Sequence, residues 1–243
     1  MRWKFNINKL IVVIPCAGYG SRFLSDIPKQ YHFINNKTIL EHTISKFITI
    51  PNITQIIVTV NSNDKYITQY LSQEILQKID IRYLGANSRM ETVLNTILSL
   101  GNIDENTWIM VHDAVRCCIS TQLIKAQIKE LADNRIGGIL AIPVNDTLKQ
   151  TYLKNGQYYI QNNIKRDMVY LSQTPQMFRL HLLKYHLPYV LSMPEYAKII
   201  TDEASIFESL NLPIKILQGS KLNIKITTPD DLIIARLIIN ASL

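Results

Sequence analysis

The sequence is poor in the residues that form disulfide frameworks and metal sites. It has three cysteines in 243 residues, Cys16, Cys117 and Cys118, an odd number without metal-type spacing. Its five histidines likewise lack the spacing of zinc ligands. Because disulfides belong to oxidising compartments, we expect reduced cysteines and a cytoplasmic protein.

Long apolar runs are also absent. Arg2, Lys4 and Lys9 precede a short apolar run, as in a signal peptide, but the run is too short and no small-residue cleavage site follows it. No stretch approaches the length of a membrane-spanning helix. The sequence therefore predicts neither a secretory signal nor a membrane protein.

Clustered charge is missing as well. The chain is 47% hydrophobic and 19% charged, and it carries a net charge of +7. Its lysines and arginines are dispersed and no aromatic RNA-binding motif accompanies them, so a nucleic-acid partner is not expected. A basic balance also suits an enzyme whose substrates are phosphorylated. At this length we expect one α/β domain over residues 1–243.

Two common phosphate-binding signatures are absent. A P-loop requires a Gly-Lys pair, and the chain has none. The dinucleotide fingerprint requires a third glycine after Gly18 and Gly20, and Phe23 stands in its place. A phosphate loop in this chain must therefore be of another kind.

Such a loop is nevertheless present after the first apolar run. Residues 10–14 are β-branched and too few for a helix, which predicts a buried strand. Gly18 and Gly20 then allow a tight turn with exposed amide groups, and Arg22 and Lys29 add two cations. Amide dipoles and positive charges both favour the oxygens of a polyphosphate.

Apolar strands alternate with helices through the first half of the chain. Strands are expected at residues 10–14, 55–60, 81–84, 108–111 and 138–143. Helices are expected at 39–48, 63–78, 88–98 and 121–132, two of them behind the capping boxes that begin at Thr38 and Ser88. This order predicts a Rossmann-like, mostly parallel sheet with helices on both faces. Its ligand should lie at the carboxyl ends of the strands, where residues 16–22, 85–92 and 112–116 meet.

The segment at about 144–172 has a different character. It is polar, and Asn155-Gly156 between two alternating runs indicates a β-hairpin. Tyr158, Tyr159 and Ile160 would be exposed on an ordinary surface hairpin. We therefore expect an arm that projects from the domain and packs against a second subunit.

The last third of the chain returns to regular structure. We expect an extended segment at 173–178, a helix from about Arg179, and a helix opened by Asp202 and Glu203 with Thr201 as its cap. Strands are expected at 214–217 and 223–226. Thr228 and Pro229 are the N-cap and first residue of a final helix.

Several short motifs, taken in order, give the chain a family resemblance. The first loop reads P-x-A-G-x-G-x-R and is followed by Pro28-Lys29-Gln30, as in the nucleotidyltransferases that activate sugar and polyol phosphates. The further matches are Thr38-Ile-Leu-Glu-His42, Val111-His-Asp-Ala114 with Arg116, Pro143-Val-Asn-Asp-Thr147, Thr174-Pro-Gln176, Thr201-Asp-Glu-Ala-Ser205 and Asn223-Ile-Lys225. Together they resemble the 2-C-methyl-D-erythritol 4-phosphate cytidylyltransferase family of non-mevalonate isoprenoid synthesis.

The resemblance implies an activity and a set of residues. The family joins CTP to the polyol phosphate, releases pyrophosphate and uses Mg²⁺. It implies catalytic roles for Arg22, Lys29, Arg166 and Lys225. It implies nucleotide binding by Cys16, Ala17, Gly18, Gly20, Gly85, Arg89 and Thr92, and acceptor binding by Arg116, Thr147, Arg166, Thr201 and Lys225. It also implies a homodimer in which arm residues reach the neighbouring site.

Asp113 is the expected metal ligand. It follows the fourth strand at the predicted rim, where a carboxylate suits Mg²⁺, which is usually held by one or two carboxylates with phosphates and water. A helix N-cap without metal is the alternative for this residue. Arg116 could pair with Asp113 or with substrate.

Three positions differ from the family pattern. Cys117 replaces the usual proline after Arg116, Asn87 stands where an acidic residue is frequent, and Leu222 stands where aspartate is common.

Other functions remain as alternatives to this one, and a ribitol 5-phosphate cytidylyltransferase is the nearest of them. A catalytically inactive nucleotide-binding regulator and a nucleic-acid-binding protein are the alternatives from other classes.

Overall fold

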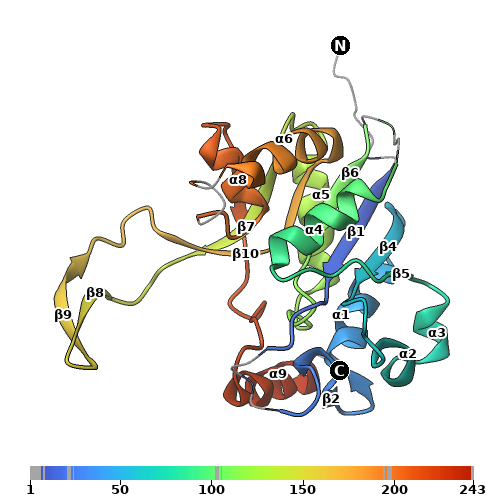
Figure 1. The fold of residues 1–243 in the computed structure, drawn as a ribbon, viewed down its shortest axis with the longest axis horizontal. Coiled ribbons are helices and arrows are strands. Elements are labelled where there is room, and N and C mark those ends of the chain that lie inside the picture. Colours follow the sequence, from blue (N-terminus) through green and yellow to red (C-terminus); the bar gives the residue numbers. More distant parts are fainter. Residues whose placement is uncertain are drawn as a thin grey trace.

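A mixed seven-stranded sheet forms the centre of the protein (Figure 1). The computed structural model describes residues 7, 9–20, 23, 25–101, 104, 106–193, 195 and 199–241. The strands are β1 (Leu10–Pro15), β4 (Ile53–Thr59), β5 (Asp80–Arg82), β6 (Trp108–Val111), β7 (Gly137–Pro143), β10 (Tyr170–Arg179) and β11 (Lys215–Gln218). They lie in the order β11-β7-β10-β6-β1-β4-β5. All neighbours are parallel except β10, which runs antiparallel to β6 and β7, so the expected mostly parallel sheet is confirmed.

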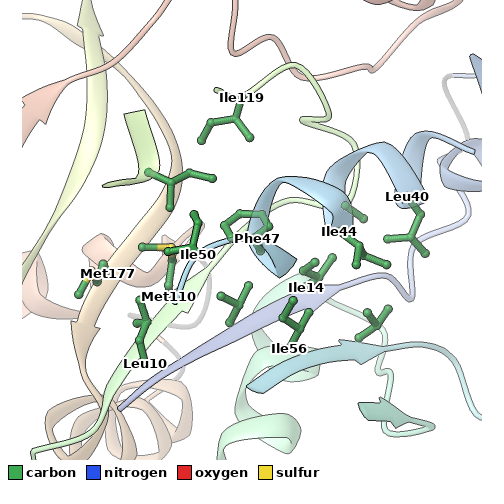
Figure 2. Packing of buried hydrophobic residues seen from close by; sticks show 14 of the residues in the cluster. Leu10, Ile14, Leu40, Ile44, Phe47, Ile50, Ile56, Met110, Ile119 and Met177 are labelled. Atoms are coloured by element: carbon green, nitrogen blue, oxygen red, sulfur yellow. The ribbon is translucent and has the colours of Figure 1, made fainter. Parts of the chain in front are cut away.

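Helices pack on both faces of this sheet. The longer ones are α1 (Ile39–Ile48), α4 (Arg89–Leu98), α5 (Thr121–Leu131), α6 (Leu180–Ser192), α8 (Glu203–Ser209) and α9 (Pro229–Ala241). Side chains alternate along a strand, so neighbours in β1 face opposite layers. Val12 belongs to the cluster with α1 and α5, whereas Val13 belongs to the cluster with α4, α6 and α8. Figure 2 shows the first cluster, with Phe47 and Ile44 of α1 over the sheet.

A third, smaller cluster lies beside the end of β6. Val115 and Cys117, which follow β6, pack with Ile226 and with Ala235 of α9. Cys117 is fully buried there, so it fills an apolar position. The final helix is thereby attached to the edge of the sheet at which the site was predicted.

Both predicted capping boxes are present. The Thr38 hydroxyl accepts from the Glu41 amide at the start of α1, and the Glu41 carboxylate accepts from the Thr38 amide. Ser88 and Glu91 make the same reciprocal pair at the start of α4. Each box satisfies amides that a helix leaves without partners, which is why the two helices begin at these residues.

The helix predicted over 63–78 is wrong. Two short helices occupy the segment instead, α2 (Ile67–Tyr70) and α3 (Gln73–Leu76), with extended backbone at Leu71 and Ser72. The Ser72 amide donates to the Glu41 carboxylate at 2.8 Å. This tertiary hydrogen bond removes the amide from the helical pattern, so it favours the break between the two helices.

Two predictions near the C-terminal third also need correction. Residues 223–226 do not form a strand, because the Asn223 side chain donates to the Thr174 carbonyl at 2.8 Å and draws this segment away from a regular ladder. The N-cap of α8 is Asp202 and not Thr201, since the Asp202 carboxylate accepts from the Ser205 amide at 3.1 Å.

The predicted hairpin forms a separate two-stranded sheet, β8 (Leu148–Lys154) with β9 (Gln157–Ile164). Its turn has positive φ at Asn155 (52°) and Gly156 (75°), the conformation that an Asn-Gly hairpin turn requires. The hairpin extends away from the main sheet as an arm (Figure 1). Tyr158 and Ile160 on it are 77% and 64% exposed. Within the described residues, no helix has both the length and the apolar character needed to cross a membrane.

Candidate active site at the rim of the sheet

A cavity of about 470 Å³ opens at the carboxyl ends of the central strands. Its lining comes from the segments after β1, β4, β5 and β6, from the start of α4, and from Lys29, Gln30 and Lys225. The described lining residues are Pro15, Cys16, Ala17, Gly18, Tyr19, Lys29, Gln30, Asn61, Ala86, Asn87, Ser88, Arg89, Thr92, Asp113, Ala114, Val115 and Lys225. The structure thus brings together the three strand exits that the sequence placed at one rim.

The glycine loop is shaped by two neighbouring side chains. Gly20 has φ of +70°, and a Cβ atom there would lie 2.9 Å from Cδ of Lys29. The Gln30 amide donates to the carbonyls of Cys16 at 3.1 Å and Gly18 at 3.3 Å. Because these carbonyls are bound from the protein side, the loop has a fixed orientation towards the cavity. Arg22 lies outside the described residues.

Gln30 was not among the predicted site residues, although it is the last residue of the Pro-Lys-Gln motif. The signal that could have identified it is its position directly after Lys29. A buried glutamine there needs acceptors for its amide, and the loop carbonyls are the nearest backbone groups.

Asp113 is the centre of a cluster of cations. Its Oδ1 lies 2.9 Å from Nε of Arg89, and its Oδ2 lies 3.2 Å from Nε of Arg116 and 3.1 Å from Nζ of Lys225. Burial alone would raise the pKa of Asp113, but the three cations hold it well below its usual range. Asp113 is therefore ionised, and it determines where Arg89, Arg116 and Lys225 are placed.

Glu203 binds the other side of Arg89, and sequence reasoning did not assign it to the site. Its carboxylate oxygens lie 2.8 Å from Nη1 and 3.2 Å from Nη2 of Arg89. Glu203 has no exposed surface. Burial raises its pKa, while the charge of Arg89 opposes that rise.

The neutral ring of His112 supports the turn that carries Asp113. His112 Nε2 lies 3.2 Å from the Arg116 carbonyl, and its Nδ1 lies 3.0 Å from the Thr174 hydroxyl, which accepts from the Asp113 amide. A carbonyl can only accept, so Nε2 carries the proton and Nδ1 accepts from Thr174. Burial lowers the pKa of His112 to about 3. The ring therefore stays neutral and fixes the turn that presents Asp113.

The predicted nucleotide-binding residues are close together. Cys16, Ala17, Gly18, Arg89 and Thr92 line the cavity. Gly85 packs beside them, because a Cβ atom there would lie 2.5 Å from Cβ of Ala17. The Thr92 hydroxyl accepts from the Ala86 amide at 3.0 Å and donates to the Ser88 carbonyl at 2.9 Å. Thr92 therefore holds the loop before α4 in place.

A second, smaller cavity of about 160 Å³ lies on the other side of the Asp113 cluster. Arg89, Asp113 and Lys225 line both cavities. Arg116, Ser172, Gln173, Thr174, Gln176, Thr201 and Asp202 complete the smaller one. Two of the predicted acceptor-binding residues, Arg116 and Thr201, thus lie beside Lys225.

The remaining predicted acceptor residues, Thr147 and Arg166, are in the arm segment. Neither is among the described residues that line the two cavities of this chain. Arg166 donates to the carbonyl of Asn145 within the same segment. Of the departures from the family pattern, Asn87 lines the larger cavity, whereas Leu222 is 57% exposed.

Comparison with known proteins identifies this arrangement. The family model for IspD, 2-C-methyl-D-erythritol 4-phosphate cytidylyltransferase, matches residues 10–241. The chain is 40% identical to the enzyme of that name from Vibrio vulnificus (strain YJ016), over 95% of this chain and 94% of the relative. It is 38% identical to that from Buchnera aphidicola subsp. Acyrthosiphon pisum, covering 93% and 92% of the two chains.

Solved structures agree with the sequence relatives. The crystal structure of a Francisella tularensis 2-C-methyl-D-erythritol 4-phosphate cytidylyltransferase (IspD) superposes with a TM-score of 0.78 at 34% identity, over 95% of this chain and 99% of that one. A 4-diphosphocytidyl-2C-methyl-D-erythritol synthase gives 0.79 at 34% identity, over 96% and 98%. Because the family model matches nearly the whole chain, this chain belongs to the 2-C-methyl-D-erythritol 4-phosphate cytidylyltransferase (IspD) family.

Proposed function

We propose that the two cavities on either side of Asp113 bind CTP and 2-C-methyl-D-erythritol 4-phosphate. The enzyme transfers the cytidylyl group of CTP to this phosphate, giving 4-diphosphocytidyl-2-C-methyl-D-erythritol and pyrophosphate in the non-mevalonate pathway. The observation that carries the assignment of the cavities is the cation cluster that lines both of them, formed by Arg89 and Lys225 around Asp113.

The reaction requires charge stabilisation more than proton transfer. A phosphate oxygen of the acceptor attacks the α-phosphorus of CTP, and the bond to the bridging oxygen of the pyrophosphate breaks. The attacking oxygen is already anionic at neutral pH, so no general base is needed. The obstacle is repulsion between two anions, which fixed cations reduce. We assign this role to Arg22 and Lys29 on the nucleotide side.

The larger cavity is assigned to the nucleotide. Cytosine differs from uracil by an amino donor where uracil has a carbonyl acceptor, so acceptor groups of the protein can select it. We assign this selection to backbone groups near Cys16, Ala17 and Gly85, beside the loop that Thr92 holds in place. Gly18, which lines this cavity, and the nearby Gly20, which does not, would face the triphosphate, and Arg89 lines both cavities.

The smaller cavity is assigned to the acceptor. Arg116 and Lys225 would bind its phosphate, and Thr201 would contact its hydroxyl groups. We further propose a homodimer in which Thr147 and Arg166 of one arm complete the acceptor site of the partner. The exposed tyrosines and Ile160 of the arm support this, because they form apolar surface on a segment that extends from the body.

We also propose that Mg²⁺ accompanies CTP. Asp113 is the one carboxylate among the described residues that line the larger cavity, and the described chain holds no cluster of three metal-binding side chains. Both Asp113 oxygens already contact cations. This donor set fits an ion held mainly by triphosphate oxygens and water, with Asp113 as its one protein ligand. When bound, Mg²⁺ supplies neutralisation of triphosphate charge.

Pyrophosphate release from CTP tests the function. The expected result is turnover with 2-C-methyl-D-erythritol 4-phosphate and little with ribitol 5-phosphate at equal concentrations. Faster turnover with ribitol 5-phosphate would reassign the acceptor. UTP in place of CTP is the control for the base. Absence of turnover with both acceptors, together with retained CTP binding, would favour a nucleotide-binding regulator.

A further inference from the structure

We propose that Glu203 is a positioning residue for cytidylyl transfer. It acts by fixing Arg89, whose position affects both the nucleotide cavity and the acceptor cavity. The inference rests on the proposed use of the two cavities. Glu203 touches neither cavity among the described lining residues, whereas Arg89 lines both. Its influence on the reaction must therefore pass through the guanidinium that it binds.

The contact between the two side chains is bidentate. Oε1 of Glu203 lies 2.8 Å from Nη1 of Arg89, and Oε2 lies 3.2 Å from Nη2. Parallel charge-assisted hydrogen bonds of this kind fix the plane of a guanidinium as well as its position. The Glu203 side chain has no exposed surface and the Arg89 side chain is 24% exposed, so water screens the pair little.

The backbone around Glu203 is held in place by hydrogen bonds between its neighbours and Gln176. Glu203 is the first residue of α8, directly after the N-cap Asp202. The next amide, that of Ala204, donates to Oε1 of Gln176 at 2.8 Å. The other end of the Gln176 side chain donates to Asp202 at 2.8 Å. The start of α8 is thus fastened to β10, and the Glu203 carboxylate has a defined position before any substrate binds.

The orientation of Arg89 decides how Asp113 is shared. With its two terminal nitrogens on Glu203, Arg89 turns Nε towards Oδ1 of Asp113. Oδ2 then remains for Arg116 and Lys225. Without the Glu203 charge, Arg89 would be free to rotate towards Oδ2 or towards bound phosphate. An Arg89 that moved to Oδ2 would compete there with Arg116 and Lys225, and both cavities would change together.

A double-mutant cycle tests this coupling. Glu203→Gln keeps the shape of the side chain but removes its charge. We expect it to lower kcat/KM roughly 10-fold to 100-fold, within the range of coupling in charged networks. In an Arg89→Gln background, the same change should have little further effect, because the side chain through which Glu203 acts is gone. Glu208→Gln, which removes an exposed carboxylate of α8, is the matched control.

Further readouts separate positioning from a purely structural role. Glu203→Asp keeps the charge and should restore part of kcat, whereas a role in folding alone would move the melting temperature and leave kcat of the folded fraction unchanged. If Glu203→Gln does not fold, Glu203→Asp with and without Arg89→Gln completes the same cycle. Wild-type kcat/KM in Glu203→Gln, or an equal loss in both backgrounds, would overturn the proposal.

Binding of CTP distinguishes this inference from the proposed function. Calorimetric titration with CTP needs no acceptor and no turnover. The coupling is supported if Glu203→Gln weakens CTP binding in the wild-type protein but weakens it no further in the Arg89→Gln variant. This result would hold even if the acceptor proves to be another polyol phosphate. Turnover by the wild-type enzyme with unchanged CTP binding and unchanged kcat in Glu203→Gln would leave the function intact and remove Glu203 from it.

Discussion

Lys29 donates a hydrogen bond from its ammonium to the carbonyl of Ile226 at 3.0 Å, across 197 positions of the chain. The Ile226 amide in turn donates to the carbonyl of Val115, just beyond β6, at 3.0 Å. The irregular segment at 223–226 therefore links the cation after the first loop to the turn that carries Asp113. The Ile226 carbonyl thus fixes the direction of the Lys29 side chain, so less conformational entropy is lost when its ammonium group is held beside a triphosphate.

Replacement of Lys29 should reduce the rate of the chemical step. We expect Lys29→Ala to lower kcat about 10²–10³-fold, as for other lost electrostatic donors. Steady-state pyrophosphate release measures the effect. Lys37→Ala removes an exposed lysine of β3 (Lys37–Thr38), which pairs with β2 (Phe33–Ile34); it should leave kcat within about 2-fold and serves as the control. Near wild-type turnover of Lys29→Ala would exclude this role.

Removal of Mg²⁺ should abolish turnover. Chelation by EDTA is expected to stop pyrophosphate release, and added Mg²⁺ should restore it. Asp113→Asn should raise the Mg²⁺ concentration needed for half-maximal rate, since a ligand to the ion loses its charge. If that concentration does not change while kcat falls, Asp113 serves only to hold its three cations.

Mixed dimers test the arm. A dimer of one Lys29→Ala chain and one Arg166→Ala chain should contain one intact site if Arg166 acts in the partner's site. Partial recovery of activity on subunit exchange is therefore expected. Lys29→Ala mixed with Lys225→Ala is the control, because both lysines line one cavity of the same chain, so neither site of that dimer is intact. Equal recovery in both mixtures, or none in either, would argue against a shared site.

Acid should destabilise the protein partly through His112. Its pKa is about 3 in the folded chain, against the ordinary histidine value of 6.5, so below pH 6.5 the unfolded chain binds a proton that the folded chain does not. Stability from this group is therefore full above pH 6.5 and falls towards pH 3, by at most about 1.4 kcal/mol per pH unit. Urea unfolding between pH 4 and pH 7 measures it.

His112→Gln is the informative variant for that experiment. Glutamine retains one donor and one acceptor but does not titrate, so the slope of stability against pH should become shallower in this window. A variant slope equal to that of the wild type would show that other groups cause the acid sensitivity.

Local sequence signals were enough for the elements whose ends are determined locally. Thr38 with Glu41 and Ser88 with Glu91 are reciprocal caps within one turn, so their helices could be predicted from four residues each. Asn155-Gly156 similarly determines the hairpin turn. The break between α2 and α3 could not be predicted, because it involves a hydrogen bond from Ser72 to Glu41, 31 positions away.

The site was predictable where strand order alone brings residues together. Cys16, Gly85 and Asp113 follow parallel strands, so their common rim follows from the fold class. Gln30 and Glu203 were missed because their roles depend on partners that strand order does not supply. Glu203 reaches Arg89 across 114 positions, and no periodicity or spacing in the chain encodes that pairing.

The close approach of Gly20 to the Lys29 stem has a consequence for protein engineering. The aliphatic part of the lysine passes directly under the backbone of the turn, where even a methyl group would collide with it. A side chain at position 20 would therefore have to displace the Lys29 stem, and it would also have to adopt the left-handed backbone that favours glycine. Because Lys29 is assigned to charge stabilisation, directed evolution of this loop for activity should retain glycine at position 20 together with lysine at position 29.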